Sequence, residues 1–167
     1  GKYSDQAEQT SCKNCGNGKY LDATGQDAET DCKDCVAGKY QDQTAQDAAA
    51  DCKDCAVGQF HAQAAQGSCD NCAVGQYADQ VAQTACKNCG NGKYNDQAGQ
   101  DAEGDCKVCA AGKFQDGVGQ DAVGDCKSCP EGKYQADTAQ ADCDACAVGK
   151  YLDQTDQDQS SDCKDCA

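Results

Sequence analysis

The sequence lacks most of the residues from which a hydrophobic core is built. Its 167 residues include no Met, Trp, Ile or Arg, and the only leucines are Leu21 and Leu152. Burying a large apolar side chain contributes only about 1.5–3 kcal/mol, whereas ordering the backbone costs about 1–2 kcal/mol for every residue. Eight valines and nine aromatic residues cannot offset that cost, so an ordinary globular core is excluded.

Basic residues and long apolar runs are also scarce. The chain has 14 basic residues against 29 acidic ones, which gives a net charge of −15. Nucleic acid is not expected as a partner, because phosphate binding requires basic patches. No apolar run approaches the roughly 20 residues that span a bilayer, so membrane insertion is not expected. Without an initiator Met or a visible signal peptide, we expect a mature or excised segment.

Catalytic residues are missing as well. His61 is the single histidine, and we expect it to be an exposed substitution. No Ser/His/Asp set, activated nucleophile or phosphate-binding loop is visible, so neither a catalytic residue nor a cofactor-binding residue is expected, and the chain is interpreted as a non-enzyme.

Cysteine is the abundant residue, with 18 of 167 positions. That share is typical of secreted disulfide scaffolds, and it predicts a location outside the cell or at the cell surface. The cysteines form nine C-x-x-C pairs, and each pair follows a Gly-[Lys/Gln]-[Tyr/Phe] segment.

This pattern divides the chain into nine repeats, and the series of repeat lengths itself recurs after 74 residues. The expected repeats are 1–17, 18–37, 38–57, 58–74, 75–91, 92–111, 112–131, 132–148 and 149–167, and the super-repeats are 1–74 and 75–148. The longer repeats carry extra residues before their cysteines. Repeats of this size stack on their neighbours.

The expected fold class is therefore a small disulfide-rich repeat protein. We expect an elongated rod or solenoid of short β-hairpin and loop units with little helix, and at most one turn at 48–50. If each repeat spans a few extended residues, nine repeats give a rod on the order of 100–150 Å.

Three roles for the C-x-x-C pairs remain open. A zinc site is compatible with one of the two spacings, but an odd number of pairs does not divide into four-thiolate sites. A redox centre normally lies at a helix N-terminus, which these polar loops lack. We favour disulfides that join the second cysteine of one repeat to the first of the next. The expected pairs are Cys15–Cys32, Cys35–Cys52, Cys55–Cys69, Cys72–Cys86, Cys89–Cys106, Cys109–Cys126, Cys129–Cys143 and Cys146–Cys163.

The motif C-P-x-G-x-Y…C-x-x-C resembles the ephrin-receptor-like cysteine-rich repeat, and also the first small module of tumour necrosis factor receptor cysteine-rich domains. The most similar copy is CPEGKY at 129–134. The resemblance implies the same disulfide connectivity and an aromatic ring packed on each disulfide. The residues expected in that role are Tyr3, Tyr20, Tyr40, Phe60, Tyr77, Tyr94, Phe114, Tyr134 and Tyr151.

Aspartates recur at fixed places, for example Asp42, Asp47, Asp51 and Asp54. A solvated, self-repelling acidic face is expected, with no metal ligand and no cofactor. Calcium held between repeats is the alternative, although no EF-hand loop is present. O-linked sugar on residues such as Thr44 is a further expectation.

Eight disulfides leave Cys12 and Cys166 without partners. If a second copy followed the first directly, the number of residues between Cys166 and the Cys12 of the second copy would be one fewer than between successive C-x-x-C pairs of the short repeats. The hypothesis is an intermolecular Cys166–Cys12 disulfide that joins copies head to tail. A cut from a longer repeat chain explains the two cysteines equally well.

The sequence predicts an extracellular structural protein that acts as a stalk, spacer or filament subunit. The alternatives are a receptor-like ectodomain that binds a protein ligand, and an acidic array that binds calcium or zinc.

Overall fold

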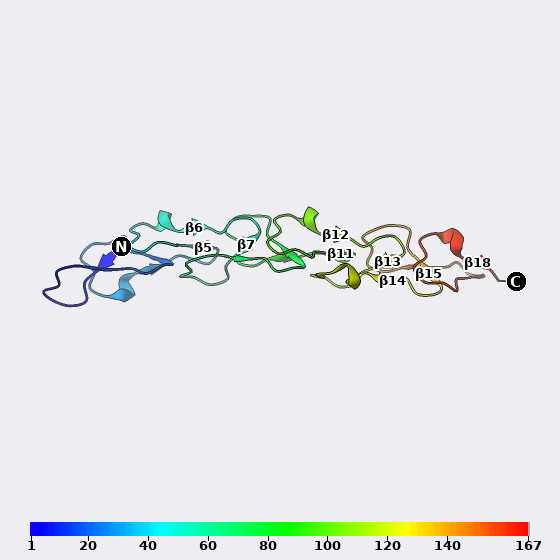
Figure 1. Ribbon diagram of the computed structural model, residues 1–167, viewed down its shortest axis with the longest axis horizontal. Coiled ribbons are helices and arrows are strands. Elements are labelled where there is room, and N and C mark those ends of the chain that lie inside the picture. Colours follow the sequence, from blue (N-terminus) through cyan, green and yellow to red (C-terminus); the bar gives the residue numbers. More distant parts are fainter. Residues whose placement is uncertain (167) are drawn as a thin grey trace. The chain divides into compact units, whose positions relative to one another are not determined.

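A computed structural model describes residues 1–166, and Ala167, the last residue of the ninth expected repeat, lies outside the described residues. Antiparallel two-strand hairpins follow one another along the chain (Figure 1). In each hairpin, the second and third residues of a repeat pair with the two residues between its cysteines. The pairs are β1 (Lys2–Tyr3) with β2 (Lys13–Asn14), β3 (Lys19–Tyr20) with β4 (Lys33–Asp34), β5 (Lys39–Tyr40) with β6 (Lys53–Asp54), β7 (Gln59–Phe60) with β8 (Asp70–Asn71), β9 (Gln76–Tyr77) with β10 (Lys87–Asn88), β11 (Lys93–Tyr94) with β12 (Lys107–Val108), β13 (Lys113–Phe114) with β14 (Lys127–Ser128), β15 (Lys133–Tyr134) with β16 (Asp144–Ala145), and β17 (Lys150–Tyr151) with β18 (Lys164–Asp165).

The only helical elements in residues 1–166 are single 3₁₀ turns, and they lie in the longer repeats. They are η1 (Glu29–Asp31), η2 (Ala49–Asp51), η3 (Glu103–Asp105), η4 (Val123–Asp125) and η5 (Ser160–Asp162). The last residue of each turn is an aspartate that accepts a hydrogen bond from the backbone before the turn, as Asp51 Oδ2 does from Ala48 N at 3.0 Å. The extra residues of the longer repeats therefore build a capped turn.

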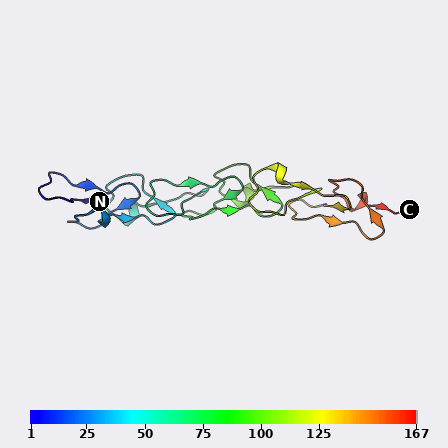
Figure 2. The same ribbon diagram turned by 90° about the horizontal axis from the view of Figure 1, so that it is seen from below.

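The predicted class, a small disulfide-rich repeat protein of short hairpins with little helix, is confirmed. Each hairpin is a separate two-stranded sheet, and the turned view shows that the strands of successive hairpins do not merge (Figure 2). An isolated hairpin of this size is unstable in water. The disulfides and the contacts between repeats must therefore stabilise the fold.

The chain forms two compact halves. The first contains Gly1–Cys72 and Ala78–Cys86, and the second contains Ala73–Tyr77 and the chain from Lys87 onward. The same set of contacts between repeats recurs inside each half.

Neighbouring repeats are joined through the backbone of their first and fourth residues. Gly18, the first residue of its repeat, donates its N–H to the carbonyl of Gln41, the fourth residue of the next repeat, at 2.9 Å. Gln41 in turn donates its N–H to the carbonyl of Gln66, one repeat further on, at 2.9 Å. In the second half Gly92, Gln115 and Gln140 make the same two bonds at 2.8 and 3.0 Å.

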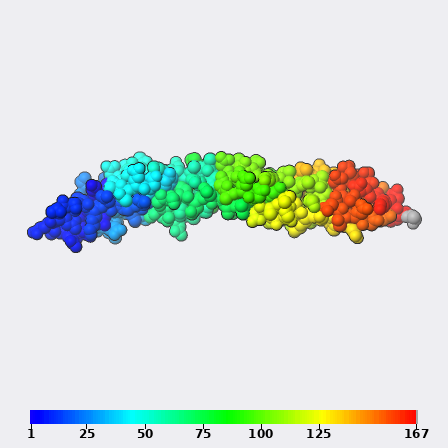
Figure 3. All heavy atoms as spheres, in the orientation of Figure 1, coloured from blue at the N-terminus to red at the C-terminus, as the bar shows by residue number. Residues whose placement is uncertain are grey.

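Repeats two places apart are also in contact. Ala45, the eighth residue of its repeat, donates its N–H to the carbonyl of Cys15 at 3.0 Å, and Ala139 does the same to Cys109 in the second half. The space-filling view shows the first repeat, in dark blue, lying against cyan atoms of the third (Figure 3). Within each half, a repeat therefore contacts both its neighbour and a repeat two places away.

The first glycine of a repeat is required for this contact. Gly38 has φ +80°, in the left-handed region, and an added Cβ would lie 2.2 Å from the carbonyl oxygen of Ala82. Gly132 has nearly the same φ of +81°, but nothing lies within 4 Å of its added Cβ. Both glycines thus need the left-handed conformation that glycine adopts most readily. Only Gly38 also lies too close to another backbone to carry a side chain.

We expect Gly38→Ala to lower the free energy of unfolding more than Gly132→Ala. The left-handed conformation costs about 1–2 kcal/mol in both variants, and overlap with the Ala82 backbone adds about 1–3 kcal/mol in Gly38→Ala alone. Guanidinium titrations followed by tyrosine fluorescence measure both, with disulfide mapping to check the fold. Equal losses would mean that the close approach between repeats does not matter.

Candidate functional site at the contacts between repeats

Eight disulfides connect the repeats, and they are the eight pairs expected from the sequence. The Cα–Cα distances lie between 5.6 and 5.8 Å, and the sequence separation is 17 or 14 residues. Each bond joins the end of one C-x-x-C to the start of the next. These sixteen sulfurs are therefore engaged in covalent bonds and are not free to act as thiolate ligands of zinc.

The second cysteine of each repeat is buried where a later repeat covers it. Cys15, Cys35, Cys89, Cys109 and Cys129 are 0–1% exposed, and each of them accepts the N–H of the eighth residue two repeats on. Cys146 is only half-buried, and no such donor reaches it from residues 1–166. The contact between repeats two places apart therefore covers the second cysteine. It does not cover the whole disulfide, because Cys55 makes the contact and is 0% exposed while its partner Cys69 is only half-buried.

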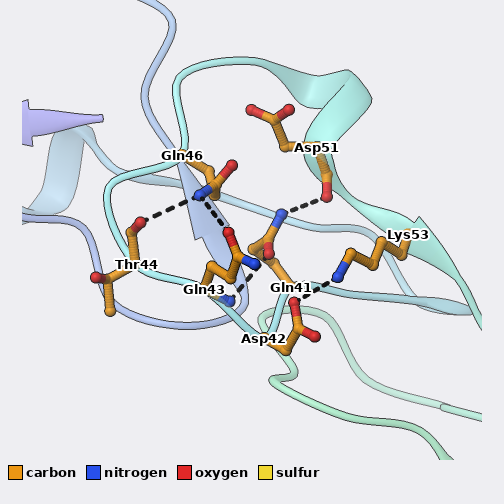
Figure 4. A network of polar contacts seen from close by, with 7 residues as sticks. All are labelled: Gln41, Asp42, Gln43, Thr44, Gln46, Asp51 and Lys53. Carbon is orange, nitrogen blue, oxygen red and sulfur yellow. Dashed lines mark hydrogen bonds and ion pairs between the residues drawn. The ribbon is translucent and has the colours of Figure 1, made fainter.

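The fourth residue of a repeat fills a small buried site between repeats. Gln41 lies there, 2% exposed, and donates its Nε2 to the carbonyl of Asp51 while its Oε1 accepts the N–H of Gln43 at 3.0 Å (Figure 4). Leu21 fills the equivalent place in its repeat and is also buried. Ala78, the fourth residue of its repeat, is likewise buried. The site therefore accepts an apolar side chain or an amide whose polar atoms are hydrogen-bonded.

His61 occupies this same site in the fourth repeat. Its side chain is 14% exposed, so the expectation of an exposed substitution was wrong. Nδ1 accepts the N–H of Gln63 at 3.2 Å, as the Gln41 oxygen does from Gln43, and Nε2 lies 3.6 Å from Asp70 Oδ2. Histidine here takes the structural role of the buried amide.

Sequence reasoning missed the fourth, eighth and ninth residues of the repeats. The ninth residue is glutamine in every repeat, and its carbonyl accepts the bond from the preceding repeat, as Gln46 does from Leu21 at 2.9 Å. That recurrence was the available signal. The residues are Gln9, Gln26, Gln46, Gln66, Gln83, Gln100, Gln120, Gln140 and Gln157.

The lysine after the first cysteine pairs with an aspartate at the fifth position of its repeat. Lys53 lies 2.7 Å from Asp42, and its Nζ lies 5.7 Å from the centre of the Tyr40 ring. The hydrogen bond from Lys53 lowers the pKa of Asp42 below its ordinary value, and the bond to Asp42 raises the pKa of Lys53. Both groups are exposed to solvent, so the pair contributes little stability.

The aromatic residues lie on the first strand of each hairpin. Tyr3 is buried in a cluster with the Cys15–Cys32 disulfide and Leu21, and Tyr77 is buried with Cys89 and Cys106. Tyr151, by contrast, is 45% exposed. Packing of the remaining aromatic side chains on disulfides stays a prediction.

The aspartates expected as an acidic face have protein partners in several cases. Asp42 pairs with Lys53 and Asp54 with Lys39, each at 2.7 Å, and Asp51 caps η2. Within residues 1–166, no three His, Cys, Asp or Glu side chains are grouped so as to hold a metal ion. Calcium binding and O-linked sugar remain untested expectations.

Cys12 and Cys166 are the free cysteines of the described chain, and both are exposed. Cys12 holds the place that pairs with a preceding repeat, and Cys166 holds the place that pairs with a following one. Their thiols are therefore the two positions at which the disulfide pattern is incomplete.

We expect three disulfides to be reduced before the other five. A thiolate must reach a sulfur to attack it, and Cys55–Cys69, Cys72–Cys86 and Cys146–Cys163 each contain a half-buried cysteine, whereas both cysteines of the other five are buried. Limited reduction, alkylation and peptide mass spectrometry give the order.

Loop length is the control in this experiment. Cys129–Cys143 closes a short loop but is buried, and Cys146–Cys163 closes a long loop but is half-buried. Early loss of Cys129–Cys143 together with the other short loops would show that loop length, not burial of both cysteines, sets the order.

Comparison with known families supports the same architecture. The family described as tyrosine-protein kinase ephrin type A/B receptor-like matches residues 43–85, 58–106 and 118–166, together more than half of the chain. The expected resemblance is thereby confirmed. No curated protein matches the chain. In the part that the structure describes, no helix has the length and apolar character needed to cross a bilayer.

Proposed function

Because the chain belongs to the family of ephrin-receptor-like cysteine-rich repeats, we propose that it is an extracellular spacer, a stalk or filament segment that sets a distance. The family is one of receptor-like cysteine-rich modules, and disulfides of this density persist in oxidising surroundings outside the cytosol. Both points favour a place outside the cell or at the cell surface.

The observation that carries the proposal is the uniformity of the contacts between repeats. The first glycine of a repeat donates to the fourth residue of the next at seven successive positions, from Gly18 to Gly132, at 2.7–3.0 Å. A binding site for a dedicated ligand is built from residues that break such a pattern. Here even His61 keeps the pattern, so the contacts favour a mechanical role.

A spacer must grow in proportion to the number of its repeats. Deletion of 75–148 removes four repeats and joins Val74 to Gly149, which recreates the Ala-Val-Gly turn found at 73–75. In a linear array the maximum dimension then falls to roughly 0.55 of its original value, since repeats contribute equally. Small-angle X-ray scattering of both chains measures the ratio.

A compact protein of the same two lengths gives a different ratio. Its radius of gyration scales with about the 0.38 power of chain length, which predicts a ratio of about 0.8. A ratio near that value, with the native disulfides mapped in both chains, would rule out the spacer.

We further propose that repeats of the same kind continue the array at Cys12 and Cys166. The exposed thiols support this, because each occupies a position that forms a disulfide to the neighbouring repeat everywhere else in the array. The adjoining repeat belongs either to the same polypeptide or to a second copy, and the proposal for this chain is a Cys166–Cys12 bond between copies.

The junction predicts a ladder of covalent multimers of the 17.3 kDa chain. Denaturing mass measurements with thiols blocked and no reductant should show multiples that collapse on reduction. Cys12→Ser and Cys166→Ser should each abolish all multimers, because a head-to-tail bond needs both residues. Dimers that persist in either single variant, or a monomeric parent chain, would contradict the junction between copies.

A further inference from the structure

We propose that the disulfides and the C-x-x-C segments form one covalent path from Cys12 to Cys166, which bypasses the loops and limits how far the array can be stretched. The inference rests on the proposed spacer function and gives it a mechanical property, a maximum length under tension. It follows from which cysteines are joined and from the short segments that link them.

The path alternates between disulfides and three-residue steps of backbone. It enters at Cys12, runs to Cys15, crosses the disulfide to Cys32, and follows Lys33–Asp34 to Cys35. It then crosses to Cys52, and the pattern continues to Cys163 and Cys166. From the second repeat onward, the first strand of each hairpin and, in the longer repeats, the 3₁₀ turn lie on a bypassed loop, so tension between Cys12 and Cys166 does not pass through them.

The bypass sets a low limit on extension. Nine three-residue steps at about 3.3–3.6 Å per residue, with eight disulfide crossings of 5.6–5.8 Å, reach only about 135–145 Å. The same stretch of open chain, from Cys12 to Cys166, would reach about 510–550 Å. The covalent path therefore limits the array to about a quarter of the length that the open chain would reach.

The steps themselves offer little slack. The two residues between the cysteines form the second strand of every hairpin, as Lys53–Asp54 does in β6. A β-strand already rises about 3.3 Å per residue, close to the maximum for an extended chain. Stretching the array therefore straightens the angles between steps but cannot lengthen the steps.

Reduction releases the bypassed length in discrete amounts. A dithiol supplies the two electrons: one thiolate attacks a cysteine sulfur and forms a mixed disulfide, and the second thiol closes the reagent's own disulfide and leaves two cysteine thiols. A separation of 17 residues then releases about 50–55 Å, and a separation of 14 residues about 40–45 Å. Five disulfides belong to the long class and three to the short class.

The chain provides its own attachment points for a pulling experiment. In a single chain that is not bonded to a second copy, Cys12 and Cys166 are exposed free thiols at the two ends of the path, so maleimide-linked DNA handles place an optical trap across the path. Without reductant, the distance between the thiols should stop near the limit of about 135–145 Å. With dithiothreitol under tension, we expect eight further steps, five of about 50–55 Å and three of about 40–45 Å.

Two paired variants test the assignment of length to individual loops. Removing one disulfide by Cys35→Ser with Cys52→Ser should lengthen the unreduced limit by about 50–55 Å, and Cys55→Ser with Cys69→Ser by about 40–45 Å. The two changes are matched in chemistry and differ only in the bypassed loop. Each variant should also show one step fewer in dithiothreitol.

Two results would overturn the inference. One is stretching of the unreduced chain by hundreds of ångströms; the other is equal added lengths in the two variants. Either would mean that tension passes through the loops. Neither result bears on whether length scales with repeat number, so failure here is distinguishable from failure of the spacer function, which scattering tests separately.

Discussion

The structure depends on a close approach of two backbones that belong to repeats two places apart. The first glycine of one repeat meets the eighth residue of the other at a distance that leaves no room for a side chain, as Gly38 does at Ala82. The same eighth residue donates its N–H to the carbonyl of a second cysteine, and it has a positive φ to do so, +58° at Ala82. Glycine at one partner and a positive φ at the other are thus the conditions for this contact, which covers the second cysteine of a repeat.

A chain with two leucines compensates for its missing core with directional polar contacts. The buried fourth position holds Leu21 in one repeat and Gln41 in the next. The amide of Gln41 forms hydrogen bonds with two backbone groups, which an apolar side chain cannot do. Buried polar groups are tolerated when they are fully hydrogen-bonded. The result is a series of small clusters, each around one disulfide, in place of one continuous hydrophobic core.

The sequence was sufficient for the hairpins and the fold class, because the signals for both are local: a glycine turn, an aromatic residue and a C-x-x-C within each repeat. It was insufficient for the contacts between repeats two places apart. Those contacts are made by backbone groups of residues as different as Ala45, Gly119 and Asp156, so no side-chain pattern identifies them. His61 was misjudged for a related reason, since its burial follows from its position in the repeat and not from its residue type.

The repeats differ in length because some of them carry extra residues, and these residues lie outside the segments that form hydrogen bonds between repeats. Apart from the disulfides, the backbone hydrogen bonds between repeats are made by the first nine residues and the second cysteine. The extra residues of the longer repeats fall between the ninth residue and the first cysteine, as at 47–51. Whole repeats of either length can therefore be duplicated or lost by unequal recombination without disturbing the register of those that remain. A gene built in this way can change the reach of its product in single-repeat increments, with each intermediate able to fold.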